Sequence, residues 1–384
     1  MKNVAVIFGG RSTEHDVSIV TALSSIIAPI EMLSGYKPIP VYIARDGSWY
    51  TGDDLKEVHF YSGGNLEDKL KKMKKLSLKF DDGLWLLKPG LGGEKIRVDI
   101  VFPSMHGTYG EDGSLMGLLR MAGVPFVGCD MAASVIAMDK VLTKQLVSDA
   151  GLAVTKYVWF EKRDWQKNSK EIITKINNLK YPLFVKPAHL GSSIAITKVK
   201  TKDELENALE VAMHYDDKIL VEEGVTNLTE VTVPVMGNDK PRVGMVEESL
   251  AKAEFFDFES KYMNGGKKIK GFGKDEGGDK STWSRIPAKI PKPLYKECEN
   301  LALATYKVLG CSGISRVDLL IDSGKKIYVN EVNTLPGTLY RHNWQKAGVS
   351  AVELVEKLLH FAIERFEESK RLTTVFNTNF LKQF

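Results

Sequence analysis

The strongest constraint on the fold is an alternation of strand-like and helix-like patterns in the first third of the chain. The runs VAVIFGG (4–10), KPIPVYIA (37–44) and VDIVFPSMHG (98–107) are rich in β-branched residues, and residues 16–33 have the apolar spacing of a helix. Parallel strands need a crossover connection, which is usually a helix. This rhythm therefore predicts βαβ units and a mainly parallel sheet over residues 3 to about 130.

The rest of the chain forms two further blocks. The second, to about residue 215, opens with a single helix pattern over 134–151 and continues with a strand at 181–187. The third is rich in strands and ends in an amphipathic helix at 351–366. Its predicted strands lie at 218–225, 229–237, 241–250, 315–322 and 326–334.

Composition excludes several classes of protein. No run approaches the roughly 20 apolar residues of a membrane span, and the apolar start that leads into glycines predicts a buried strand instead of a signal peptide. The three cysteines are widely spaced, which suits a reducing cytoplasm. The net charge of +4 favours a solvated surface over a nucleic-acid-binding face, and a basic pocket for a phosphate ligand is equally consistent with it.

Three oxygen-bearing side chains are candidate metal ligands. Asp318 lies on one predicted strand, and Glu331 and Asn333 lie two apart on the next, so these two point to the same face. Oxygen ligands beside Arg316 suit magnesium with a phosphate group, and do not suit zinc. The alternative is that these carboxylates face solvent on a hairpin.

A second candidate is a phosphate site in YPLFVKPAHLGSS (181–193). Lys186 ends an apolar strand, and backbone amides in the loop at Gly191 and Ser192 can hold phosphate oxygens. The pattern is not a P-loop, because no Gly-Lys-Ser/Thr follows the glycine. A surface lysine beside a flexible turn is the alternative.

Two more groups of residues are candidates near predicted turns. Glu14 precedes a helix, where it either holds an ammonium group or caps the helix. His106 follows a buried strand, where it either polarises a carboxylate or stabilises an oxyanion, or is simply a hydrogen-bonded histidine of the turn. Gly9 and Gly10 do not continue into G-x-G-x-x-G, which disfavours a dehydrogenase.

A segment rich in glycine and lysine, at about 262–286, predicts a long loop of the kind that forms lids. Lys261 and Tyr262 stand at its start. There they could reach into a site when the loop closes.

The order of these motifs along the chain resembles that of the D-alanine–D-alanine ligase family, within the ATP-grasp superfamily. The resemblance covers roughly residues 3 to 362. The motifs that carry it are GGRSTEHDVS, HGTYGEDGSLMGLL, AMDKVLTKQL, FVKPAHLGSS, ILVEEGV, FFDFESKY, SRVDLL and NEVNTLPG.

The resemblance implies an α/β fold, with a Rossmann-like N-terminal domain followed by a two-part ATP-grasp fold. We expect these domains at 1–130, 131–215 and 216–365, with the lid loop at about 262–286 and a tail of unknown structure at 366–384.

It also implies a role for each candidate residue. ATP would be bound by Lys140, Lys186, Glu222, Val225, Glu230 and Lys261, and two Mg²⁺ or Mn²⁺ ions by Asp318, Glu331 and Asn333. Catalysis would involve Glu14, Ser192, Tyr262, Arg316 and the backbone amide of Gly337, and substrate binding would involve His106 and His342.

The implied reaction phosphorylates the carboxylate of one D-alanine, and the amine of a second D-alanine then attacks the acyl phosphate. The dipeptide that such an enzyme makes is a precursor for peptidoglycan synthesis, and we expect the enzyme in the cytoplasm. The resemblance implies no nucleic-acid or membrane partner, and a possible homodimer. Tyr262 fits D-alanine as the nucleophile. However, the serine that the family has about five residues beyond Gly337 is replaced by His342. A ligase for D-serine, D-lactate or another second substrate, or an inactive nucleotide-binding homologue, therefore remains an alternative.

Overall fold

The computed structural model describes residues 1–90, 93–250 and 284–384. The N-terminal sheet has the order β3-β2-β1-β7, in which β1 (Lys2–Gly9) pairs in parallel with both β2 (Tyr36–Ile43) and β7 (Ile100–Pro103). Only β3 (Trp49–Thr51) is antiparallel. The predicted mainly parallel sheet is confirmed.

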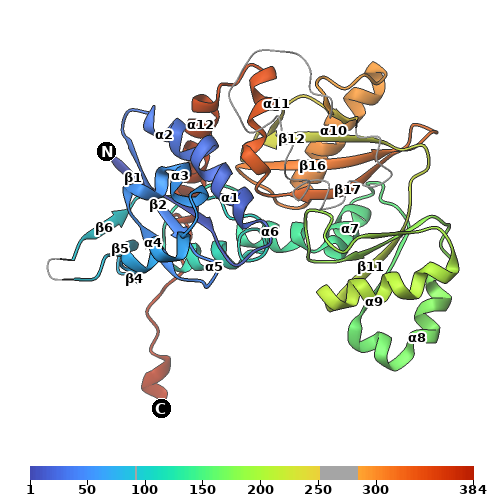
Figure 1. Cartoon of the computed structure of the whole chain (residues 1–384), viewed down its shortest axis with the longest axis horizontal. Coiled ribbons are helices and arrows are strands. Elements are labelled where there is room, and N and C mark those ends of the chain that lie inside the picture. The colour runs from blue at the N-terminus through green and yellow to red at the C-terminus, as the bar shows by residue number, and fades with distance from the viewer. Residues whose placement is uncertain (91–92, 251–283) are drawn as a thin grey trace.

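Helices and a small hairpin sheet surround this sheet (Figure 1). The predicted helix at 16–33 is a continuous helical segment made of α1 (His15–Thr21), a π-helical stretch (Ala22–Ile27) and α2 (Ala28–Glu31). The other elements of this region are α3 (Val58–Ser62), α4 (Leu66–Lys72), α5 (Ser114–Met121), a 3₁₀ turn (Asp53–Lys56), and the antiparallel strands β4 (Ser77–Phe80), β5 (Leu84–Leu87) and β6 (Lys95–Val98).

The single helix predicted over 134–151 is wrong, because the segment forms two helices. These are α6 (Met131–Met138) and α7 (Lys140–Asp149). Asp139, between them, has extended backbone angles, and its side chain accepts hydrogen bonds from the N–H groups of Val141 and Leu142. Its carboxylate thus caps a new helix that begins at Lys140.

A second sheet is antiparallel, in the order β10-β9-β11-β8, with a core of its own beneath α8 (Lys162–Ile176) and α9 (Leu205–Tyr215). Its strands are β8 (Tyr157–Glu161), β9 (Leu183–Pro187), β10 (Thr197–Val199) and β11 (Lys218–Glu223), and a 3₁₀ turn (Lys202–Glu204) precedes α9. The strand that we predicted at 218–225 thus pairs with the second block, although we grouped it with the third.

The third sheet contains the predicted hairpin of candidate metal ligands. Its order is β15-β14-β12-β16-β17, with β13 beside β12, and α10 (Lys292–Val308) packs on it. The strands are β12 (Thr229–Met236), β13 (Arg242–Val243), β14 (Glu247–Ser249), β15 (Ser284–Arg285), β16 (Ile314–Ile321) and β17 (Ile327–Asn333). None of the helices in the described residues is long and apolar enough to cross a membrane.

The end of the chain returns to the beginning. After a short turn (Gly337–Tyr340) and α11 (Arg341–Lys346), helix α12 (Ala351–Ser369) packs against the N-terminal region, and Leu358 and Leu359 share a buried cluster with Val4 and Phe8. Figure 1 shows α12 beside α2, and the last residues, with a 3₁₀ turn at Phe380–Gln383, extending away from the body.

Candidate active site

One cavity of about 940 Å³ lies between the three regions built on the N-terminal, second and third sheets. Segments of all three regions line it. Within the described part of the chain, every candidate residue except His342 lines it. These residues are Glu14, His106, Lys140, Lys186, Ser192, Glu222, Val225, Glu230, Arg316, Asp318, Glu331, Asn333 and Gly337. Lys261 and Tyr262, with the predicted lid, lie outside the described residues.

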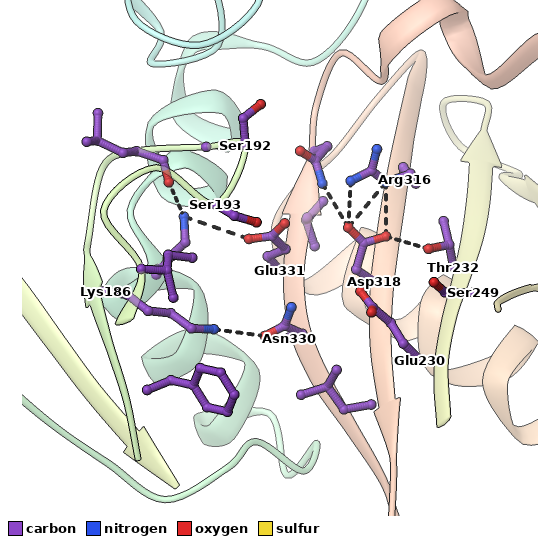
Figure 2. A pocket seen from close by; sticks show the side chains of 18 of the residues that line it. Lys186, Ser192, Ser193, Glu230, Thr232, Ser249, Arg316, Asp318, Asn330 and Glu331 are labelled. Atoms are coloured by element: carbon purple, nitrogen blue, oxygen red, sulfur yellow. Dashed lines mark hydrogen bonds and ion pairs between the residues drawn. The ribbon is translucent and has the colours of Figure 1, made fainter. Parts of the chain in front are cut away.

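The candidate metal ligands converge because of strand register. In the antiparallel pair β16–β17, Asp318 is opposite Glu331 and Arg316 is opposite Asn333. The Asp318 carboxylate is almost fully buried and accepts hydrogen bonds from Thr232 Oγ1 (2.9 Å) and Asn333 Nδ2 (3.2 Å), as Figure 2 shows for Thr232. Two carboxylates and an amide oxygen on adjacent strand positions are the hard donors that magnesium prefers, so the residues fit that ion.

Arg316 lies beside these carboxylates. Its Nε is 2.9 Å from Asp318 Oδ1, and one terminal nitrogen is 2.7 Å from Oδ2. Although burial opposes it, the Asp318 carboxylate raises the pKa of Arg316, so this guanidinium is a permanent cation. Both Arg316 and Gly337 line the cavity, as an oxyanion-stabilising pair requires.

Two lysines line the cavity near these carboxylates, and Figure 2 shows one of them, Lys186, on the opposite wall. Lys140, the first residue of α7, donates to the Leu190 carbonyl at 2.6 Å and lies 3.7 Å from Glu331 Oε2. Lys186, near the end of β9, is 3.4 Å from Asn330 Oδ1. Two ammonium groups facing two carboxylates across a cavity can hold phosphate groups bridged by a cation between them.

Glu222 is held from two sides. One of its carboxylate oxygens is paired with Lys186 and the other with Lys144 at 2.6 Å, and Thr155 also donates to it at 2.6 Å. Burial alone would raise the pKa of Glu222, but the two ammonium groups hold it far below its usual range. Val225 and the exposed Glu230, which lies on β12 of the third sheet, also line the cavity.

Glu14 faces the cavity instead of capping its helix. It occupies the position before α1, yet its side chain makes no capping hydrogen bond and accepts one from the Ser192 hydroxyl. Gly107 permits this approach, because a Cβ there would lie 2.7 Å from Glu14 Oε2. Glu14 and Ser192, both of which the resemblance places in catalysis, are therefore hydrogen-bonded to each other.

His106 is buried at the same end of the cavity. Its Nε2 is 3.0 Å from Thr21 Oγ1, and Thr21 Oγ1 also accepts the N–H of Thr338 at 3.0 Å. Burial lowers the pKa of His106, which keeps the ring neutral near pH 7. The histidine is thus part of a hydrogen-bonded chain that reaches the turn after Gly337.

Glu111 is a site residue that the sequence did not reveal to us, although it lies inside the HGTYGEDGS motif. It lines the cavity and accepts the N–H groups of Gly107 (2.8 Å) and Leu335 (3.2 Å). Burial, together with the nearby Glu14 carboxylate, raises the pKa of Glu111 to about 8. Lys144 was missed in the same way, because only its place in the fold distinguishes it from other helix lysines.

The resemblance places His342 in substrate binding, but His342 does not line the cavity. Its Nε2 donates to Glu247 at 3.0 Å, and Glu247 lines the cavity. The amide nitrogen of Asn343 is also 3.3 Å from this carboxylate. The ring of Tyr340, which does line the cavity, lies over the guanidinium of Arg316 at 5.7 Å.

The chain matches known protein families over most of its length. Residues 3–129 match the family model described as "D-ala D-ala ligase N-terminus", and residues 146–360 match "D-ala D-ala ligase C-terminus". A D-alanine–D-alanine ligase of Geobacillus kaustophilus is 36% identical, over 97% of this chain and 98% of that protein.

Two solved structures have the same fold. The VanG D-Ala:D-Ser ligase of Enterococcus faecalis has a TM-score of 0.78 and 35% identity, over 94% of this chain and 99% of that one. The D-alanine–D-alanine ligase of Coxiella burnetii has a TM-score of 0.78 and 26% identity, over 96% of each chain.

Proposed function

The chain belongs to the D-alanine–D-alanine ligase family of ATP-grasp enzymes, and from this premise we propose that it joins D-alanine to a second small D-amino acid, with ATP converted to ADP and phosphate. The family serves peptidoglycan synthesis and uses ATP and Mg²⁺. We expect the reaction to take place in the cytoplasm. D-alanine is our first choice for the second substrate.

The observation that carries the proposal is the convergence of three kinds of group on one cavity. The Glu14 carboxylate can bind the ammonium of an amino acid, and the Arg316 guanidinium can face the carboxylate of the same molecule. Lysines paired with carboxylates, such as Lys140 with Glu331, can hold a nucleoside triphosphate. An acid, an amine and ATP are the three reactants of such a ligase. The first amino acid and ATP each have charged counterparts in this cavity.

The chemistry asks for positioning and charge neutralisation more than for covalent help. In the first step Glu14 orients the first D-alanine so that its carboxylate attacks the terminal phosphate of ATP. Lys186 offsets the charge on the phosphoryl group. In the second step, Arg316 and the Gly337 amide stabilise the oxyanion that forms when the second amine attacks.

Asp318, Glu331 and Asn333 would hold Mg²⁺. When bound there, the ion neutralises phosphate oxygens and lowers the barrier to phosphoryl transfer. The side-chain amide N–H of Asn333 donates a hydrogen bond to the Asp318 carboxylate. Its amide oxygen is therefore the atom that would serve as a ligand.

The second substrate is the finer part of the proposal. The names of the curated relatives support D-alanine, as does Tyr262 in the sequence. D-serine is the second candidate, because a D-Ala:D-Ser ligase is among the similar structures and because a Glu247–His342 pair stands where the family has a serine.

The test is a comparison of second substrates. Purified protein with ATP, Mg²⁺ and D-alanine should release phosphate and form a dipeptide detectable by mass spectrometry. Reactions that add D-serine or D-lactate then rank the nucleophiles by kcat/KM. No phosphate release with any pair of D-amino acids would contradict the ligase proposal and favour an inactive nucleotide-binding homologue.

A further inference from the structure

His189 lies between two carboxylates just before the glycine-containing loop. Its Nδ1 is 3.0 Å from Asp216 Oδ1, and its Nε2 is 3.3 Å from Asp139 Oδ2. Its backbone N–H also donates to Asp216 Oδ2 at 2.7 Å. Because both ring nitrogens face carboxylate oxygens, both contacts are favourable only when both nitrogens carry a proton, and the ring is then a cation.

Asp139 connects this ring to the lysine-bearing helix. Its Oδ1 accepts the N–H groups of Val141 (2.8 Å) and Leu142 (3.1 Å), while its Oδ2 faces His189. The helix that it caps begins at Lys140, which lines the cavity. The position of the first turn of α7 is therefore tied to the histidine through a single carboxylate.

The backbone on either side of His189 contacts Lys140 as well. The N–H of Lys140 donates to the Ala188 carbonyl at 3.1 Å, and its Nζ donates to the Leu190 carbonyl at 2.6 Å. Lys186 lies three residues before His189, and Ser192 lies three residues after it. The 186–190 segment thus contains Lys186 and also accepts two hydrogen bonds from Lys140. These are two of the lysines proposed to bind the phosphates of ATP.

We propose that His189, in its protonated form, is a positioning residue for the nucleotide: it fastens the 188–193 segment to the start of α7 and so fixes Lys140 relative to Lys186. The proposal rests on the proposed ATP-binding function of these lysines. Nothing in it requires His189 to touch the substrate.

The charges around the ring favour its protonated form. Asp139, Asp216 and Asp217 surround it, and the nearby cation Lys218 is itself paired with Asp139 at 2.6 Å. Hydrogen bonds to Asp139 and then to Asp216 raise the pKa of His189 to about 9. A histidine with a raised pKa keeps its contribution at low pH and loses it as pH rises through the raised value, so the fastening weakens through about pH 9.

The expected effect is moderate, because the His189 side chain is 43% exposed and Lys218 continues to hold Asp139. Loss of one charge-assisted hydrogen bond under these conditions weakens nucleotide binding by about threefold to tenfold. An effect on binding shared by ground and transition states appears in KM for ATP and leaves kcat nearly unchanged.

The experiment compares His189→Gln and His189→Arg with the wild type, by calorimetric binding of Mg·ADP and by KM for ATP between about pH 7 and about pH 10, a window that brackets the pKa of about 9. The wild type should lose affinity with a midpoint near pH 9. His189→Gln should bind weakly at all these pH values, and His189→Arg, a permanent cation, should bind well without the midpoint. His214→Gln, at an exposed histidine of α9, is the matched control and should behave as the wild type.

The proposal is overturned if His189→Gln retains both wild-type affinity and the midpoint. If that variant does not fold, NMR titration of the His189 ring in the wild type, with and without Mg·ADP, gives the answer, because a ring that titrates near pH 6.5 in both states contradicts a protonated clamp. Failure of the proposed function is separate. It appears as absence of phosphate release by the wild type, whereas Mg·ADP binding still reports on His189.

Discussion

The two walls that meet beside Arg316 are built on different principles. On the strand wall, Asp318, Glu331 and Asn333 converge because Asp318 pairs with Glu331 and Asn333 follows two residues later on the same face. The ladder shifts register only between Asp318 and Leu319. On the turn wall, Thr338, Leu339 and Tyr340 all have φ near +50°, a left-handed conformation that costs a non-glycine residue about 1 kcal/mol or more. The first wall follows from local geometry. The second exists only because distant contacts hold it.

Those contacts are specific. Asn343, which is fully buried, exchanges two hydrogen bonds of 2.9 Å with the backbone of Met245, and Arg341 donates to the Ser24 carbonyl at 3.2 Å. The strand wall should therefore be sensitive to changes of charge, and the turn wall to the loss of anchoring. Five measurements test this difference, in order of decreasing expected effect.

The strand wall is tested most severely by Glu331→Gln. The amide keeps the shape and removes the charge that faces Lys140, so turnover should fall by about 10³-fold or more as metal binding weakens. Steady-state rates across a magnesium titration measure it. Asp322→Asn, on the turn of the same hairpin and outside the cavity lining, should be almost silent. Wild-type turnover of Glu331→Gln at limiting magnesium would show that the metal assignment is wrong.

The carboxyl of Glu111 accepts the N–H groups of Gly107 and Leu335 and so joins the N-terminal region to the segment after β17. Its pKa of about 8 lies above the usual 4.5. Between these values the folded protein keeps a proton that the unfolded chain releases, so the free energy of unfolding should fall by up to a few kcal/mol as pH rises. Glu111→Gln should flatten this slope in urea unfolding measured at several pH values. Glu210→Gln, at an exposed position, should leave the slope as it is. An unchanged slope in Glu111→Gln contradicts the assignment.

Anchoring of the turn wall is tested by Asn343→Ala. This change removes both hydrogen bonds to the partly buried backbone of Met245, so the free energy of unfolding should fall by about 1–3 kcal/mol. Chemical denaturation measures the loss, and Asn178→Ala at the surface is the control. A change below about 0.5 kcal/mol would mean that the turn has other supports.

The link from the turn wall to substrate choice is tested by His342→Ala. Glu247 would lose one donor and shift within the cavity, so KM for the second amino acid should change by about fivefold, whereas KM for ATP stays the same. Initial-rate kinetics with each substrate varied in turn separate the two. His360→Ala, at an exposed position of α12, is the control. Equal changes in both KM values would contradict a local role.

The smallest effect is expected for Thr338→Gly. Glycine adopts a φ of +50° without steric cost, so stability should rise by up to about 1 kcal/mol. The same substitution at Thr174, exposed in helix α8, should lower stability by a similar amount. Matching signs at the two positions would show that the left-handed turn carries no strain of this kind.

The two walls also explain how far the sequence could predict the molecule. The parallel N-terminal sheet and the convergence of Asp318, Glu331 and Asn333 on β16–β17 were predictable, because alternation of strand and helix patterns and the two-residue repeat are local signals. The break at Asp139 was missed since the apolar spacing continues through it, although an aspartate before Lys140 is a capping signal. The place of β11, the buried Lys144–Glu222 pair and the Glu247–His342 contact depend on residues far apart in the chain.

The return of α12 to the first sheet has a consequence for how the protein is made. Its leucines complete the apolar cluster around Val4 and Phe8, so the N-terminal domain cannot close this core until α12 has been translated. During that interval its unfinished face is exposed to chaperones and proteases. Removing α12 would therefore destabilise the N-terminal domain more than the C-terminal sheet that precedes the helix.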